Sequence, residues 1–262
     1  NKALKLSLEN QFVPAMGYTY TYDDAPITTR RNHTWFQLAV SQAGNLLGAG
    51  YAIAGKKFNE EGKHLLGNKF AQFVKGTAEI RYDYKIGHNQ HLVGRMMAGA
   101  VYSYGNARVA PYSEQFYIGG SNSIRAFHIR SIGPGSYHPE KRSVTAYLDQ
   151  TGDIKLEGNI GYRFKIAGRL NGAVFVDAGN VWLLRKEKER PGGEFRLKDL
   201  WREIALGTGF GLRYDITYIV IRADLGVALH APYNTGKPGY FNIRNYDFRD
   251  GLVLNLAIGY PF

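Results

Sequence analysis

The chain has 262 residues, a mass of 29.4 kDa and a formal net charge of +11. Cysteine is absent, which excludes thiolate metal sites, a cysteine nucleophile and a disulfide framework. No apolar run approaches the roughly 18 residues of a membrane-spanning helix, whereas the 32 glycines, 19 tyrosines and 14 phenylalanines favour β structure.

Apolar and polar residues alternate with a period of two, which predicts nine strands. In chain order these strands cover residues 4–22, 33–41, 70–86, 91–104, 153–166, 170–183, 202–214, 218–230 and 252–262. The first is the least regular, because Pro14 has no N–H for a ladder. In the third, the face that runs from Val74 to Ile86 is uncharged, and the other face carries both signs of charge. The fold class expected is all-β.

A soluble antiparallel sheet also alternates in this way, with its apolar face inward. These strands, however, have about the nine to eleven residues, or more, that a tilted membrane strand needs. Aromatic residues gather near strand ends, as in Tyr102 with Tyr104 and Tyr260 with Phe262, which is typical of the girdles of outer-membrane barrels. The pattern therefore predicts a transmembrane antiparallel β-barrel.

The connections between the predicted strands alternate in length. The short ones are 23–32, 87–90, 167–169 and 215–217, and the long ones are 42–69, 105–152, 184–201 and 231–251. Short periplasmic turns and long outer loops are the usual asymmetry of bacterial barrels. This alternation predicts that Phe262 lies at the periplasmic end.

The loop 42–69 nearly matches a phosphate-binding P-loop at Gly50, Gly55, Lys56 and Lys57. Lys57 replaces the hydroxyl residue that would hold magnesium, and neither a buried parallel strand before the motif nor a clear helix after it is predicted. A solvated outer loop is the better interpretation.

Other site classes find little support in the sequence. His88 and His91 lie at a turn, where a solvated role is favoured over a metal because three or four ligands must converge. The run from Gly119 to Ser123 does not form a nucleophile elbow. Basic residues lie in loops or alternate with acids, which disfavours nucleic acid and leaves outer-membrane lipid and acidic glycolipid as partners for the positive charge.

One constellation joins the longest loop to a strand after it. The loop carries Ile124, Arg125, Ala126 and Phe127, and the strand 170–183 carries Phe175, Asp177 and Gly179. Asp177 has the opposite parity to Val174 and Val176, which are expected to face lipid, so its carboxylate should point into the lumen. A guanidinium delivered there can pair with it in a bidentate manner.

With the terminal Phe262, these motifs resemble the BamA/TamA superfamily of outer-membrane assembly barrels. The closest similarity is to the translocation and assembly module barrel subunit in its lipoprotein variant. The resemblance implies that residues 105–152 form an extracellular loop that folds back into the lumen, where Arg125 contacts the motif of Phe175, Asp177 and Gly179. Ala126 replaces the family's usual glycine, so we expect an ordinary backbone conformation there.

The resemblance also implies a function. It predicts a non-enzymatic barrel of the cell outer membrane, without cofactor or metal, that assists the insertion or export of client outer-membrane or surface proteins together with a periplasm-spanning partner. Residues 1–262 would then be the C-terminal nine strands of a sixteen-stranded barrel, which would explain why no signal peptide, lipid-carrying cysteine or periplasmic domain is seen. Clients would be templated at a weak seam beside the last strand, whose signal residues would be Leu256, Ile258, Tyr260 and Phe262.

Two alternatives stay open. A passive porin or a two-partner-type secretion pore would have the same strand pattern and would conduct ions steadily. An outer-membrane lipase barrel is the third class, and the missing nucleophile elbow counts against it.

Overall fold

The computed structural model describes residues 2–24, 31–139, 146–216, 218–233 and 251–261, which build one antiparallel sheet of nine strands. The order in the sheet is β1-β2-β5-β6-β7-β8-β9-β10-β11, so β1 and β11 are its edges. The strands are β1 (Ala15–Asp23), β2 (Asn32–Ala43), β5 (Phe73–Gly87), β6 (Gln90–Ser103), β7 (Ile154–Ala167), β8 (Leu170–Trp182), β9 (Ala205–Asp215), β10 (Val220–His230) and β11 (Leu252–Ile258). All nine predicted strands are confirmed, with changes at their ends.

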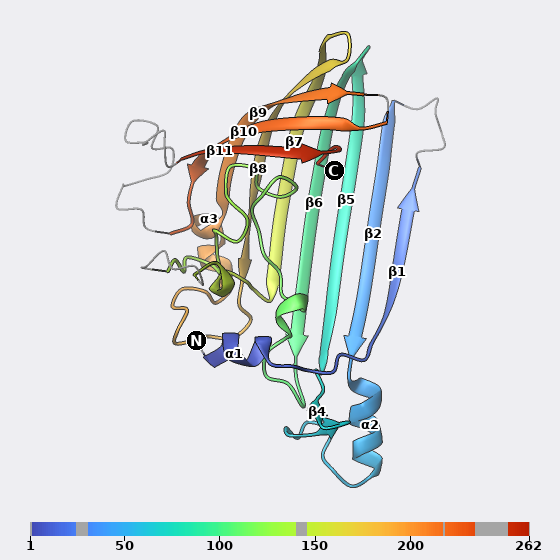
Figure 1. Ribbon diagram of the computed structural model, residues 1–262, viewed down its shortest axis with the longest axis vertical. Coiled ribbons are helices and arrows are strands. Elements are labelled where there is room, and N and C mark those ends of the chain that lie inside the picture. The colour runs from blue at the N-terminus through green and yellow to red at the C-terminus, as the bar shows by residue number, and fades with distance from the viewer. Residues whose placement is uncertain (1, 25–30, 140–145, 217, 234–250, 262) are drawn as a thin grey trace.

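The sheet is strongly twisted. In Figure 1, β2, β5 and β6 run along the long axis of the molecule, and β9, β10 and β11 cross the view at a steep angle to them. A twist of about 20–25° between neighbouring strands accumulates in this way over many strands.

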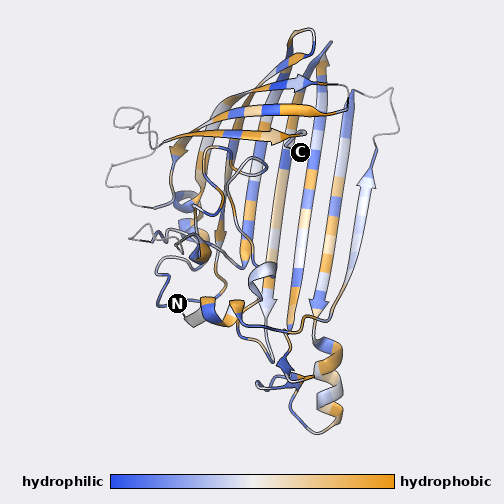
Figure 2. Cartoon of the chain, in the orientation of Figure 1, coloured by the Kyte–Doolittle hydropathy of each residue, from blue (hydrophilic) through white to orange (hydrophobic). Residues whose placement is uncertain are grey.

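Hydrophobic and hydrophilic residues alternate along the strands (Figure 2), and successive side chains point to opposite faces, so the two faces of the sheet have opposite chemistry. Even-numbered residues of every strand except β10 form the outer face, where Met96 is 68% and Leu254 65% exposed. The alternate residues, which are odd-numbered except in β10, form the inner face, where the charged side chains of Arg213 and Asp224 are 1% and 0% exposed. A water-soluble sheet buries its apolar face, so this arrangement requires an apolar medium around the outer face.

The first predicted strand is wrong over residues 4–14. Residues Lys2–Leu8 form helix α1, and β1 begins at Ala15, directly after Pro14. Leucine and lysine are good helix formers, and proline interrupts a ladder. Between helix and strand, the backbone of Phe12 pairs with Lys69 and Ala71, so this segment crosses the strand ends.

The last predicted strand, 252–262, ends early at Ile258. Gly259 has a φ of +88°, which glycine adopts without strain, and its N–H donates to the Val220 carbonyl at 2.7 Å. Pro261 then lacks an N–H to continue the ladder. Tyr260 therefore lies beyond the strand, and Phe262 lies outside the described residues.

The connections carry small elements. The predicted loop 42–69 is wrong in part, since it contains helix α2 (Asn45–Ile53) and the short hairpin of β3 (His64–Leu65) and β4 (Asn68–Lys69). Between β6 and β7 lie the 3-10 turns η1 (Tyr112–Glu114) and η2 (Ala146–Asp149), and between β8 and β9 lie η3 (Leu197–Asp199) and α3 (Leu200–Glu203). Within the described ranges, every helix is too short or too polar to cross a membrane.

The near match to a P-loop lies on α2 and not before a helix. Gly50 is inside α2, and Gly55 follows its end with a φ of +86°. A phosphate-binding loop instead lies between a strand and the N-terminus of a helix, where free N–H groups point at the phosphate. The geometry therefore agrees with the interpretation against a nucleotide site.

Candidate functional site

The centre of the candidate site is a buried ion pair between the long loop and β8. Arg125 Nε and Nη2 donate to Asp177 Oδ2 and Oδ1 at 2.9 and 2.8 Å, and the Arg125 backbone N–H donates to Oδ2 at 3.0 Å. The guanidinium carbon lies 3.5 Å from the centroid of the Phe175 ring. Arg125 is 1% and Asp177 0% exposed. Such a bidentate pair fixes the orientation of the loop as well as its position.

Strand β7 supports the same carboxylate. Asn159 Nδ2 donates to Asp177 Oδ1 at 2.9 Å and to the Ser123 carbonyl at 3.0 Å. Ser123 Oγ donates to Glu157 Oε2 at 2.6 Å and accepts the Gly119 N–H at 3.1 Å. We call residues 122–127 the loop tip; its backbone and side chains are thus held by two inward residues of β7.

The loop tip also reaches the last two strands. Arg222 Nη2 on β10 donates to Asn122 Oδ1 at 2.7 Å, and Asn255 Nδ2 on β11 donates to the Arg125 carbonyl at 2.8 Å. Arg125 therefore contacts β8 through its side chain and β11 through its carbonyl group. One short peptide segment ties together strands that are not neighbours in the sheet.

Glycines on the inner face make room for the loop tip. A Cβ on Gly207 of β9 would lie 2.3 Å from the Ala126 Cβ, and a Cβ on Gly226 of β10 would lie 2.5 Å from the Arg125 carbonyl oxygen. Ala126 is not among the described residues with positive φ, which confirms the expectation of an ordinary conformation. The methyl group of Ala126 is accommodated because β9 carries glycine beneath it.

Gly179 lies in a similarly tight place on β8. A Cβ there would lie 2.4 Å from the Leu156 carbonyl oxygen and 2.9 Å from Ile118 Cδ1 of the loop. The loop residue above Gly179 is therefore Ile118.

The remaining residues of the loop motif are apolar and buried. Ile124 is 0% and Phe127 7% exposed, and both belong to a cluster with Ile118, Ile132 and Val181. The loop therefore covers the inner face with a hydrophobic core of its own, in addition to the ion pair. Burial of each large apolar side chain to this extent contributes about 1.5–3 kcal/mol to the stability of the folded loop.

Several residues of this site were missed by the sequence analysis. They are Asn122, Ser123, Glu157, Asn159, Gly207, Arg222, Gly226 and Asn255. The available signal was their strand parity, since the strand members all lie on the inward face of their own strands. Parity identifies the face, but it does not tell which inward residue stands beneath a loop.

The predicted C-terminal signal residues do not all lie on the same face of the sheet. Leu256 and Ile258 lie on the outer face of β11 and are 74% and 77% exposed. Tyr260 was expected to continue that face, but its ring centroid lies 4.9 Å from the guanidinium carbon of Arg163, an inward residue of β7. The left-handed turn at Gly259 directs the chain away from the strand and explains this correction.

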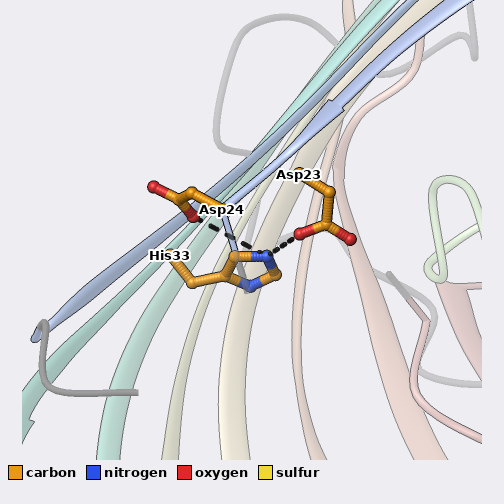
Figure 3. Close-up of side chains that lie close together, drawn as sticks. All are labelled: Asp23, Asp24 and His33. Atoms are coloured by element: carbon orange, nitrogen blue, oxygen red, sulfur yellow. Dashed lines mark hydrogen bonds and ion pairs between the residues drawn. The ribbon is translucent and has the colours of Figure 1, made fainter. Parts of the chain in front are cut away.

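Within the part of the chain that the structure describes, one group of possible metal ligands lies at the end of the β1–β2 hairpin (Figure 3). His33 Nε2 lies 2.8 Å from Asp23 Oδ1 and 3.9 Å from Asp24 Oδ1. The first distance is that of a hydrogen bond, and Asp24 Oδ1 already accepts the Thr34 N–H at 2.7 Å. These contacts hold the hairpin together. The two histidines considered from the sequence lie elsewhere, and the His91 ring hydrogen-bonds Asp83 Oδ1 at 2.7 Å.

A second polar anchor holds the connection between β8 and β9. Trp182 Nε1 donates to Glu203 Oε2 at 2.7 Å, and Asn180 Nδ2 donates to the Glu203 carbonyl. Burial raises the pKa of the Glu203 carboxyl above its ordinary value of 4.5, and the hydrogen bond from Trp182 opposes that rise.

This raised pKa gives the anchor a pH dependence. Folding raises the pKa, so the folded protein holds the proton more tightly, and the contribution of Glu203 to stability falls as pH rises from the ordinary value through the raised one. Glu203→Gln keeps an oxygen acceptor for Trp182 and cannot titrate. We expect it to lose less stability than the wild type between about pH 4 and pH 8, measured as the temperature of heat-modifiable mobility. Equal losses in both proteins would contradict the assignment.

Comparison with known proteins finds a matching protein family and two similar proteins. The model of the Omp85 superfamily domain matches residues 41–249. The outer membrane protein assembly factor BamA of Nitratidesulfovibrio vulgaris (strain Hildenborough) is 39% identical over 79 residues, which are 30% of this chain and 10% of that protein. The crystal structure of BamA from Haemophilus ducreyi lacking POTRA domains 1–3 superposes with a TM-score of 0.46 and 13% identity, over 93% of this chain and 53% of that one. The chain thus spans about half the length of that solved relative.

Proposed function

Because this chain belongs to the Omp85 superfamily and lies in the outer membrane, we propose that it is the C-terminal part of a sixteen-stranded barrel that assembles or translocates other proteins. Its clients would be outer-membrane or surface proteins, and its role would be non-enzymatic. Within the family, we propose the translocation and assembly module type in its lipoprotein variant, with a periplasm-spanning partner and with outer-membrane lipid and acidic glycolipid around the barrel.

The observation that carries this proposal is the loop tip on the inner face. Arg125 and Asp177 are buried there and hydrogen-bonded, and further contacts reach β7, β10 and β11. A barrel filled in this way favours a protein-assembly role over an open pore, because the lumen is occupied by its own loop.

The proposed seam is the free edge of β11. This strand has 7 residues, against 11 in β10, with which it pairs, and it ends in the turn at Gly259. An edge strand presents unpaired N–H and C=O groups that can template a client strand. Leu256 and Ile258 would then face lipid beside the incoming strand.

The test of the proposed function is depletion of the full-length protein in cells. We expect the levels of outer-membrane or surface proteins to fall, measured by quantitative proteomics of the outer-membrane fraction. Unchanged client levels would reject the assembly role. Recovery of an inner-membrane, periplasm-spanning protein by crosslinking would support the translocation and assembly module type, and its absence would reject that type alone.

Ion conductance distinguishes assembly from the passive pore. We expect low conductance for the wild-type barrel in planar bilayers, and a clear increase for Arg125→Ala, because the loop tip loses its main attachment. Large and equal conductance in both proteins would favour the porin or secretion pore.

A further inference from the structure

Helix α2 exposes one continuous apolar face. Leu46, Ala49, Gly50 and Ile53 follow the i, i+3, i+4, i+7 spacing of a single helical stripe. All four are exposed, Leu46 to 70% and Ile53 to 90%. An apolar stripe of this kind on a short helix is unfavourable in water and calls for an apolar partner.

The opposite face of α2 fixes the direction of the stripe. A Cβ on the buried Gly48 would lie 2.9 Å from the Gln72 amide nitrogen and 3.0 Å from the Phe58 ring. The Tyr51 ring stacks on the Phe70 ring, with centroids 6.0 Å apart. The helix cannot turn its stripe inward without breaking these contacts, so Leu46 and Ile53 point away from the protein.

The stripe begins where the outer face of the sheet ends. Gln42, near the end of β2, pairs with Val74 of β5, and Val74 pairs with Tyr102 of β6. Val74 is 39% and Tyr102 50% exposed on the outer face. Aromatic residues at strand ends lie at the membrane–water interface. Figure 1 shows α2 extending past this end of β2, so the helix leaves the sheet at the level of the interface.

Two cations follow the stripe. Lys56 and Lys57 come directly after α2, and both are exposed. The Lys56 ammonium lies 5.6 Å from the centroid of the Tyr51 ring, next to the helix. Apolar residues that enter the acyl boundary, with lysines that reach the phosphates, are the chemistry of an interfacial helix.

We propose that α2 is a lipid-binding helix of the outer leaflet, whose stripe contacts the acyl boundary and whose Lys56 and Lys57 pair with the phosphates of an acidic glycolipid. The inference rests on the outer-membrane barrel of the proposed function and names the surface that binds its lipid. It commits to lipid because the stripe lies next to the strand ends that carry the exposed Tyr102 and is followed by the positive charge of Lys56 and Lys57.

The test uses the absence of cysteine from this chain. Each variant of the full-length protein carries a single cysteine in place of Leu46, Ile53, Ile80 or Asn59, and any other cysteine is replaced by serine. The single cysteine is labelled with an environment-sensitive fluorophore. Ile80 on the outer face of β5 is the reference in the bilayer, and the exposed Asn59 is the reference in water. The protein is reconstituted into phosphatidylcholine vesicles with or without bromine on the acyl chains.

We expect bromine to quench the fluorophores at positions 46, 53 and 80, and to leave position 59 unchanged. No quenching at 46 and 53 would overturn the inference. If position 80 is quenched in that case, the membrane barrel itself stands, and if position 80 is also unquenched, the barrel fails as well.

The charge part is tested with lipid A as the anionic probe. Adding lipid A to the vesicles should increase quenching at position 53. The fraction of lipid A needed for a given increase in quenching should rise about fivefold for each lysine removed in Lys56→Gln and Lys57→Gln. Lys69→Gln, at an exposed position in β4, is the matched control. An equal requirement in all variants would overturn the phosphate contact. An equal response to phosphatidylglycerol would assign it to lipid phosphate in general.

Discussion

Arg125→Ala is expected to destabilise the folded, heat-modifiable form of the barrel strongly. The change leaves the Asp177 carboxylate, which is 0% exposed, without its bidentate partner. Removing one member of a buried pair costs about 3–5 kcal/mol, because the other charge stays buried and unpaired. The measurements are heat-modifiable mobility and the urea concentration at the midpoint of unfolding.

The chain offers a matched control for this substitution. Arg108 also pairs with a carboxylate, that of Glu61, but their side chains are 74% and 51% exposed. Arg108→Ala should therefore leave the unfolding midpoint almost unchanged, since water screens such pairs.

A double variant separates the ion pair from other effects of the change. In a protein that already carries Asp177→Ala, Arg125→Ala should cost much less than in the wild type, because no buried carboxylate remains unpaired. Additive costs would show that the two residues act independently and would contradict the assignment.

Gly226→Val is expected to expel the loop tip from the inner face while the sheet still forms. A Cβ at this position would lie 2.5 Å from the Arg125 carbonyl oxygen and 2.7 Å from the Ala126 Cα, and backbone atoms cannot move aside as a flexible side chain can. Overpacking of this kind costs about 1–3 kcal/mol or more. We expect faster proteolysis of residues 105–152 and higher conductance in planar bilayers.

Gly158→Val is the control for this second prediction. Gly158 lies on β7, and a Cβ built there meets no atom within 4 Å. Valine at this position would extend into the lipid-facing side of the sheet and should leave proteolysis and conductance as in the wild type. The same behaviour in both variants would mean that the contact between Gly226 and the loop tip does not control loop position.

Most of the fold could be predicted from the alternation of apolar and polar side chains along the chain. A period of two identifies strands and assigns each residue to a face, and for this reason the inward direction of Asp177 and the outward direction of Val174 and Val176 could be predicted. The same rule failed where the backbone leaves the strand conformation. Gly259 at a positive φ turned Tyr260 away from the outer face, and the leucines between Lys2 and Leu8 alternate although they lie in a helix.

The site itself could be predicted only in part. Arg125 and Asp177 could be paired through the resemblance of their motifs. Asn255 and Arg222 could not, because their contacts with the loop tip depend on how far the sheet curls over several strands. Helix α2 was missed because its apolar residues face outward, and its glycines lower the helix propensity of the segment.

The loop tip has a consequence for the order of folding. Arg125 contacts Asp177 at a distance of 52 residues along the chain and Asn255 at a distance of 130, and Asn122 contacts Arg222 at 100. Contacts between residues so far apart in the chain form slowly, because the intervening chain loses conformational entropy before the contacts begin to stabilise the fold. The loop tip cannot complete its contacts until β8, β10 and β11 are in position. The contacts of the loop tip therefore form late in the maturation of the barrel, and they can form only when the C-terminal strands are in register.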